Sequence, residues 1–220
     1  MQITELLTAT FLDPLPAPST SFTPPPPAST LSNLLTSLHT HILSLPTLAP
    51  LPVDSAIQRL SPHVIPFVHP APTSKSVKWT LGWEKPSEIL ICGDWSLMGH
   101  HRRGKKDGVV ELNAIDMAVV MPDSLFTVKD RTANRYFQKR AHYLAVIGSS
   151  LSTLISSKNE KASKSKEGSP GGDSELDDVW KSLTIGWEWV GGDERRAGLV
   201  LTVPKSKSFH TILLTSIRLD

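Results

Sequence analysis

The chain has 220 residues, of which 39% are hydrophobic, so it can bury a core of ordinary size. Its formal net charge of +2 excludes a global basic field, and any contact with nucleic acid must come from local clusters of cations. The single cysteine, Cys92, excludes an internal disulfide and a thiolate metal cluster. Because no run of about 18 apolar residues predicts a membrane-spanning helix, we expect a soluble, intracellular protein.

The first third of the chain alternates between proline-rich and periodic segments. Residues 1–28 are rich in proline, serine and threonine and predict a flexible arm, with a docking peptide as the alternative. From Ser29 to Leu45, leucines and isoleucines recur every three or four residues, which predicts an amphipathic helix ended by Pro46. The same reasoning predicts a short helix over Asp54–Leu60, and alternation predicts a strand over Val77–Trp83.

Two apolar strands dominate the middle of the chain. Ile89–Cys92 is short and apolar, and it predicts a buried strand, with a buried thiol, that stops at Gly93 and Asp94. Ile115–Met121 predicts a second buried strand with Asp116 near its start.

The rest of the chain predicts helix first and then strands. A short helical turn after Pro122 should lead into a long helix that ends near Ser156. Residues 158–178 are low in complexity and predict a disordered insertion within a single domain that spans 29–220. An antiparallel meander should follow, with strands at Leu183–Val190, Leu199–Val203 and His210–Arg218.

The central strands have the order found in nucleotidyltransferases, which hold a triphosphate and its metal ions on such a frame. There, two carboxylates at positions i and i+2 of a strand point to one face and share two Mg²⁺ ions. Asp116 can be the first of such a pair, but Ala118 has a methyl group where the second is needed. In the preceding turn, Asp94 follows Gly93 where a serine would contact phosphate, and its charge repels a triphosphate. We therefore predict a degenerate site that holds no metal or cofactor and is not catalytic.

The alternative is an active metal-dependent nucleotidyltransferase that uses Asp116 with a distant carboxylate such as Asp107 or Glu111. Those two residues lie on a predicted loop, whereas a two-metal site needs carboxylates on rigid elements. The same loop carries a basic cluster, which is either an RNA-binding patch or a solvated hairpin tip. The cluster comprises Arg102, Arg103, Lys105 and Lys106.

A second set of cations lies on the first half of the predicted long helix. We interpret it as a solvated helix face, and binding of RNA phosphate is the alternative. These cations are Lys129, Arg131, Arg135, Lys139 and Arg140.

Three segments carry a resemblance to a known family: EKPSEILICGDWSL at Glu84–Leu97, AIDMAVVMPDSLFTVKD at Ala114–Asp130, and NRYFQKRAHYLAVI at Asn134–Ile147. They resemble the first domain of the Nrap family, the nucleolar RNA-associated proteins of the small-subunit processome. The leucine-rich helix and the segment Val64–Val77 are also similar, so the resemblance covers roughly Leu31 to the C-terminus.

The resemblance implies one domain of a large, catalytically inert protein of the nucleus and nucleolus. The implied fold is α/β (α+β): a nucleotidyltransferase-like mixed sheet with flanking helices, extended by the C-terminal antiparallel meander. The implied role is in pre-rRNA processing and assembly of the early small-subunit pre-ribosome. The implied partners are small-subunit processome proteins, including a smaller rRNA-processing partner and casein kinase subunits, with pre-rRNA as a further contact and no membrane. We therefore predict a non-catalytic scaffold module for ribosome biogenesis, a pseudo-nucleotidyltransferase rather than an enzyme.

Overall fold

The computed structural model describes residues 27–73, 75, 77–92, 112–132, 135–164, 174–203 and 209–217. Its helices are α2 (Pro27–Ser44), α3 (Val53–Leu60), α4 (Val128–Thr132), α5 (Arg135–Lys164) and α6 (Ser174–Ser182), with short 3₁₀ helices η1 (Asp123–Leu125) and η2 (Val190–Gly192). Its strands are β1 (Leu48–Pro52), β2 (Thr80–Trp83), β3 (Glu88–Cys92), β4 (Leu112–Val120), β5 (Thr184–Trp189), β6 (Ala197–Thr202) and β7 (Phe209–Ile217). None of the helices within these ranges is long and apolar enough to cross a bilayer.

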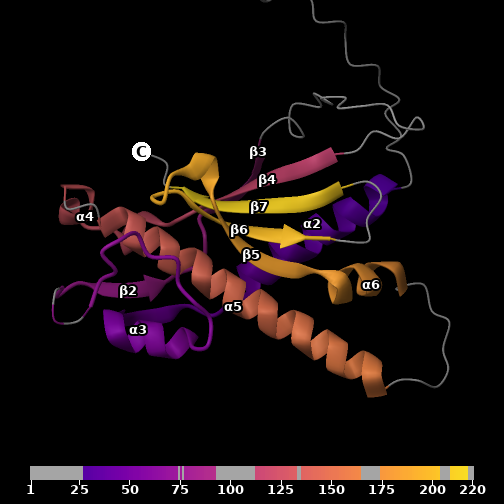
Figure 1. The fold of residues 1–220 in the computed structure, drawn as a ribbon, viewed down its shortest axis with the longest axis horizontal. Helices are drawn as coiled ribbons and strands as arrows, with labels where there is room; N and C mark the ends of the chain where they lie inside the picture. Colours follow the sequence, from indigo (N-terminus) through magenta and orange to yellow (C-terminus); the bar gives the residue numbers. More distant parts are fainter. Residues whose placement is uncertain are drawn as a thin grey trace, which may run out of the picture.

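The main sheet has five strands in the order β3-β4-β7-β6-β5 (Figure 1). β4 and β7 run parallel, and every other neighbouring pair is antiparallel. The C-terminal strands β5, β6 and β7 therefore form the predicted meander, and it joins the central strands through β7 rather than through β5. The α+β class, the mixed sheet and its C-terminal extension are confirmed.

A two-stranded antiparallel sheet, β1 with β2, stands apart from the main sheet. The strand predicted at Val77–Trp83 begins only at Thr80, and its partner β1 was not predicted because Pro50 and Pro52 interrupt the apolar pattern. A register shift between Leu48 and Leu51 accommodates this proline-containing strand.

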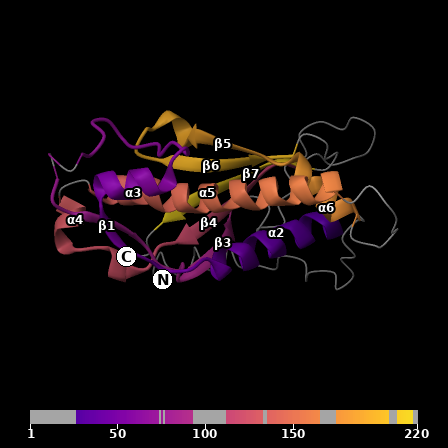
Figure 2. The same ribbon diagram turned by 90° about the horizontal axis from the view of Figure 1, so that it is seen from below.

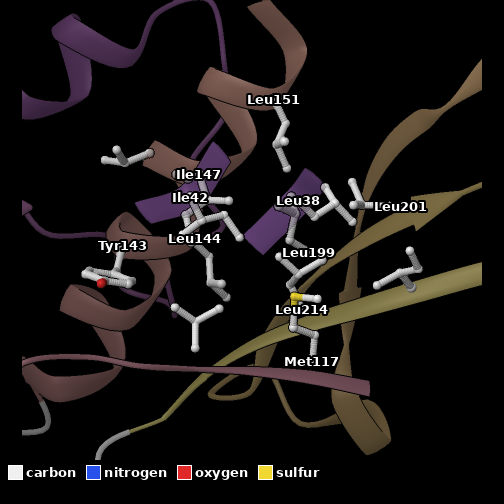
Figure 3. Packing of buried hydrophobic residues seen from close by; sticks show 14 of the residues in the cluster. Leu38, Ile42, Met117, Tyr143, Leu144, Ile147, Leu151, Leu199, Leu201 and Leu214 are labelled. Atoms are coloured by element: carbon white, nitrogen blue, oxygen red, sulfur yellow. The ribbon is translucent and has the colours of Figure 1, made fainter. Parts of the chain in front are cut away.

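The helices α2 and α5 run along the same side of the main sheet (Figure 2). Their periodic leucines and isoleucines interlock with strand residues in one apolar cluster (Figure 3). Fully or almost fully buried members include Leu38, Ile42, Leu144, Ile147, Leu151, Met117, Leu199 and Leu214. Because α2 contributes a complete apolar stripe, its predicted amphipathic character is confirmed.

An aromatic pair joins the small sheet to α5. The rings of Trp83 in β2 and Tyr143 in α5 lie 4.2 Å apart between centroids, at 35° to each other. The Tyr143 hydroxyl donates a hydrogen bond of 3.0 Å to the Glu84 carbonyl, and burial raises the pKa of this phenol. The pair packs a strand of the small sheet against the helix that covers the large one.

The structure corrects the prediction for the segment between the long helix and the meander. The disordered insertion over residues 158–178 is wrong at both ends, because α5 continues to Lys164 and α6 begins at Ser174. Trp180 of α6 is 1% exposed, and the Lys158 ammonium lies 5.9 Å from its ring centroid, so α6 packs beside the end of α5. Residues 1–26 and 165–173 lie outside the described residues.

The strand predicted as buried at Ile89–Cys92 is instead an edge strand. β3 pairs only with β4 among the described strands, and its residues from Ile89 to Cys92 are half-buried. An apolar run of this length cannot distinguish a central from an edge position, because both are consistent with a short β-branched segment.

Candidate functional site

Alternate residues of β4 point to opposite sides of the main sheet. Ile115, Met117 and Val119 are at most 1% exposed and pack toward α5. Asp116 points to the other side, which we name the Asp116 face, and it is exposed there. Ala118 lies on the same face, only 5% exposed.

The strand register gives the neighbours of these two residues. Asp116 lies between Cys92 of β3 and Leu213 of β7, and Ala118 lies between Leu90 and Thr215. Neither cross-strand neighbour of Asp116 is a second carboxylate. The sheet thus places a thiol, an alkyl side chain and a methyl group around the one acidic group on β4.

β3 contributes one carboxylate to the Asp116 face, Glu88, which pairs with Val120. Val120 is four residues beyond Asp116, so the two acidic positions are separated by about 13 Å along the strands. The metal ions of a two-metal centre are only about 4 Å apart and share carboxylates between them. Asp116 and Glu88 are therefore too far apart to bind the same pair of ions.

Most of the other predicted site residues lie outside the described part of the chain. Gly93 and Asp94 follow β3 directly and are among them, as are the alternative carboxylates Asp107 and Glu111. The predicted RNA-binding loop is outside it too: Arg102, Arg103, Lys105 and Lys106. Within the described ranges, no group of three or more histidine, cysteine or acidic residues could hold a metal ion.

Cys92 was predicted to be a buried core thiol, and that prediction is wrong. It is half-buried on the Asp116 face, and its Sγ atom is 3.9 Å from the Leu90 carbonyl oxygen. The prediction failed because β3 is an edge strand, so within the described residues no further strand lies beside Cys92.

A buried ion pair fixes the segment that follows β4. The Nζ atom of Lys139 in α5 donates to Asp130 Oδ2 at 2.8 Å and to the Leu125 carbonyl at 2.6 Å. The backbone amide and hydroxyl of Thr127 also donate to Asp130 Oδ2, at 2.6 and 2.9 Å. Burial opposes ionisation of Asp130, but these hydrogen bonds outweigh it and lower the pKa of the carboxyl group.

Lys139 and Arg140 were predicted to belong to a solvated helix face, and the structure contradicts this for both. The Lys139 side chain is 12% exposed, and Arg140 is 8% exposed. Helical periodicity could not reveal this, because Lys139 bonds to the segment before α5 and Arg140 interacts with charges in the turn between β5 and β6.

A second charged cluster lies where the start of α5 meets the turn between β5 and β6. Arg195 donates from Nε and Nη2 to the two carboxylate oxygens of Asp193, at 3.0 and 3.1 Å. Its guanidinium lies 5.9 Å from the Phe137 ring centroid, so this turn rests against the start of α5. Burial, together with the nearby Arg196, lowers the pKa of Arg140. Sequence reasoning missed this cluster because its members are more than fifty positions apart.

The fold and the site define an α+β domain whose β4 strand presents one carboxylate, Asp116, with Ala118 two residues further on the same face. The chain belongs to the Nrap family: residues 50–167, just over half of its length, match the family model described as Nrap protein domain 1. The match includes all three segments that carry the resemblance but neither α2 nor the meander, so it is shorter than predicted. None of the curated proteins compared with the chain matches it. Family membership connects the chain with nucleolar RNA-associated proteins.

Proposed function

We propose that this domain is a non-catalytic, nucleotidyltransferase-like scaffold that acts in small-subunit ribosome biogenesis in the nucleolus. The family match supports the nucleolar, RNA-associated setting. The proposal that the domain is not catalytic is supported by the position of Ala118, which lies two residues from Asp116 on the same face of β4.

A two-metal centre depends on negative charge supplied by the protein. Two metal ions neutralise a triphosphate and the developing charge of the transition state, and the carboxylates of the enzyme hold those ions in place. One carboxylate between a thiol, Cys92, and an alkyl side chain, Leu213, supplies half of the negative charge that such a centre needs. Phosphoryl transfer depends almost entirely on this positioning and electrostatic stabilisation, so little catalysis is left once the metals are lost.

A scaffold role requires surfaces that bind other molecules rather than a reaction centre. The proposed partners are proteins of the small-subunit processome, including the rRNA-processing partner and casein kinase subunits, and pre-rRNA. Within the described residues, β3 and β5 are the edge strands of the main sheet, and an edge strand can pair with an added strand of a partner. This use of the sheet edges needs no metal and is consistent with a degenerate site.

The proposal is tested by nucleotidyl transfer itself. The chain is incubated with Mg²⁺, labelled ATP or CTP and an RNA primer, and isothermal titration measures nucleotide binding in parallel. We expect no incorporation of label and no heat of binding. Incorporation that is abolished in the Asp116→Asn variant would overturn the scaffold proposal and support the alternative, an active enzyme that uses Asp116.

A further inference from the structure

The edge strand β5 exposes two tryptophans on one face. Trp187 and Trp189 are each 37% exposed. In the register they pair with Leu199 and Ala197, and Leu199 points toward α5. Both indoles therefore lie on the helix-covered side of the sheet, at the edge strand, where solvent can reach them.

The turn after β5 extends this surface with positive charge. Arg195 and Arg196 are exposed, and Arg195 contacts the ring of Phe137 at the start of α5. Arg140, Arg195 and Arg196 all interact with one carboxylate of this turn, Asp193. Asp193 is already bound by both nitrogens of the Arg195 fork, so it cannot fully satisfy the other guanidinium groups.

Arg140 lies beneath this surface with unmet hydrogen-bonding capacity. It is 8% exposed, and its Nε atom has no hydrogen-bond partner within the described structure. Asp193 partly offsets the charge of Arg196 at this guanidinium, but burying a cationic donor that has no acceptor at Nε is still unfavourable. The arrangement becomes favourable when an anion binds over Arg140 and Arg196, because one negative group then interacts with two cations.

We propose that this surface, the arginine–tryptophan strip (Arg140, Trp187, Trp189, Arg195 and Arg196), binds single-stranded RNA. The arginines contact backbone phosphates, and the indoles stack on bases. Residues two apart on a strand are separated by about 7 Å, a spacing at which two rings can receive neighbouring, splayed bases. The inference deepens the proposed function and rests on it, since it assigns the RNA contact of the scaffold to a particular surface.

The chemistry of the strip favours an unpaired RNA over the other polyanions. In a duplex the base faces are already stacked on one another, so exposed indoles gain little from it. An acidic protein segment would be attracted to the arginines but offers no planar rings in register with the two tryptophans. The combination of guanidinium groups and exposed indoles is typical of surfaces that bind single strands.

The test is fluorescence anisotropy with a labelled oligouridine of about twelve nucleotides, a length that spans a typical single-strand site. Each phosphate contact contributes about 0.7 to the slope of log K against log salt, so Arg195→Gln with Arg196→Gln should reduce the slope by about 1.4. Trp187→Leu with Trp189→Leu should weaken binding at least about fivefold and leave the slope unchanged. Leucine retains the apolar packing, and thermal unfolding verifies that each variant is folded.

The matched control is Lys78→Gln with Lys85→Gln, which removes two exposed cations on either side of β2, away from the strip. This control should change neither slope nor affinity. The proposal would be overturned if both strip variants bound the oligouridine as tightly as the wild type does. It would also be overturned if an RNA duplex bound as tightly as the oligouridine and lost the same affinity in the tryptophan variant. Competition by polyglutamate that is lost in the tryptophan variant would also overturn it and assign the strip to an acidic protein segment. These outcomes measure RNA binding, whereas the proposed function is tested by incorporation of labelled nucleotide. A failure of the strip proposal is therefore distinguishable from a failure of the proposed function.

Discussion

The Nζ atom of Lys139 lies 2.8 Å from Asp130 Oδ2, and both side chains are largely enclosed, at 12% and 2% exposure. Asp130 belongs to α4 and Lys139 to α5, so the pair spans the break between the two helices. It also anchors the segment that leaves β4, because Lys139 bonds to the Leu125 carbonyl. Lys139, which was predicted to belong to a solvated helix face, thus fixes the connection between the main sheet and its covering helix through Asp130 and Leu125.

Removing the cation of this pair should destabilise the fold. Lys139→Met keeps the length and apolar stem of the side chain but leaves Asp130 as an uncompensated, enclosed carboxylate. We expect a loss of about 3 kcal/mol in the free energy of unfolding, measured by urea denaturation at pH 7. The double variant with Asp130→Asn should recover part of the loss. Equal stability of Lys139→Met and the wild type would show that the pair has no structural role.

His142 should make the fold sensitive to mild acid. It is 4% exposed, its Nδ1 atom has no hydrogen-bond partner within the described residues, and burial with a contribution from Arg59 lowers its pKa to about 4. The unfolded chain takes up this proton near pH 6.5 but the folded chain does not. Stability should therefore be unaffected above pH 6.5, fall as the pH drops toward 4, and lose up to about 3 kcal/mol.

The test of this pH dependence compares urea midpoints at pH 7 and pH 4.5. His142→Leu should flatten the difference, whereas His39→Gln, at an exposed position of α2, should leave it intact. The low pKa of Asp130 produces a further loss of stability at lower pH in all of these proteins, because its protonation weakens the bond to Lys139. A pH dependence unchanged by His142→Leu would assign the acid sensitivity to other groups.

The hydroxyl of Tyr143 should contribute a single hydrogen bond to the contact between β2 and α5. Tyr143→Phe removes the 3.0 Å bond to the Glu84 carbonyl but retains the ring beside Trp83. We expect a loss of about 1 kcal/mol in the free energy of unfolding, measured by urea denaturation at pH 7. Tyr143→Ala also removes the ring packing and should cost about 4 kcal/mol. Similar losses for the two variants would mean that the ring contact contributes little.

Elements with a full apolar stripe could be predicted from the sequence, and elements defined by distant partners could not. The period of α2 reflects burial of one side, and the apolar run of β4 reflects burial on both sides after Asp116, and the sequence shows both patterns directly. The strand β1 was not predicted because its prolines interrupt the apolar pattern. The exposure of Cys92 was not predicted because it depends on β3 being an edge strand. Neither feature leaves a local signal in the chain.

Part of the candidate site could likewise be predicted from the sequence, and part could not. Asp116 and Ala118 must share a face because strand side chains alternate, so their relationship could be predicted from their spacing alone. Their neighbours could not, because Leu213 arrives on β7, almost one hundred residues later, through a parallel pairing. The same limit applies to Arg140, whose burial depends on a turn that lies more than fifty residues further along the chain.

Ala118 should not tolerate the carboxylate that an active centre would need. Its side chain is 5% exposed between Leu90 and Thr215, and Asp116 lies two residues away on the same face. We expect Ala118→Asp to lose about 2 kcal/mol relative to Ala118→Asn, which has nearly the same shape without the charge. Urea denaturation at pH 7 measures the difference. Equal stability of the two variants would contradict this description of the Ala118 environment.

The most direct test of the central claim, that the described strands place no second carboxylate close enough to Asp116 to hold a metal pair, is a titration with Mn²⁺ and ATP followed by electron paramagnetic resonance. Mn²⁺ replaces Mg²⁺ at carboxylate sites, and its free-ion signal decreases when it binds to protein. The account predicts the same signal for the wild type and for Asp116→Asn at every concentration of metal and nucleotide. A tightly bound Mn²⁺ that disappears in Asp116→Asn would contradict it.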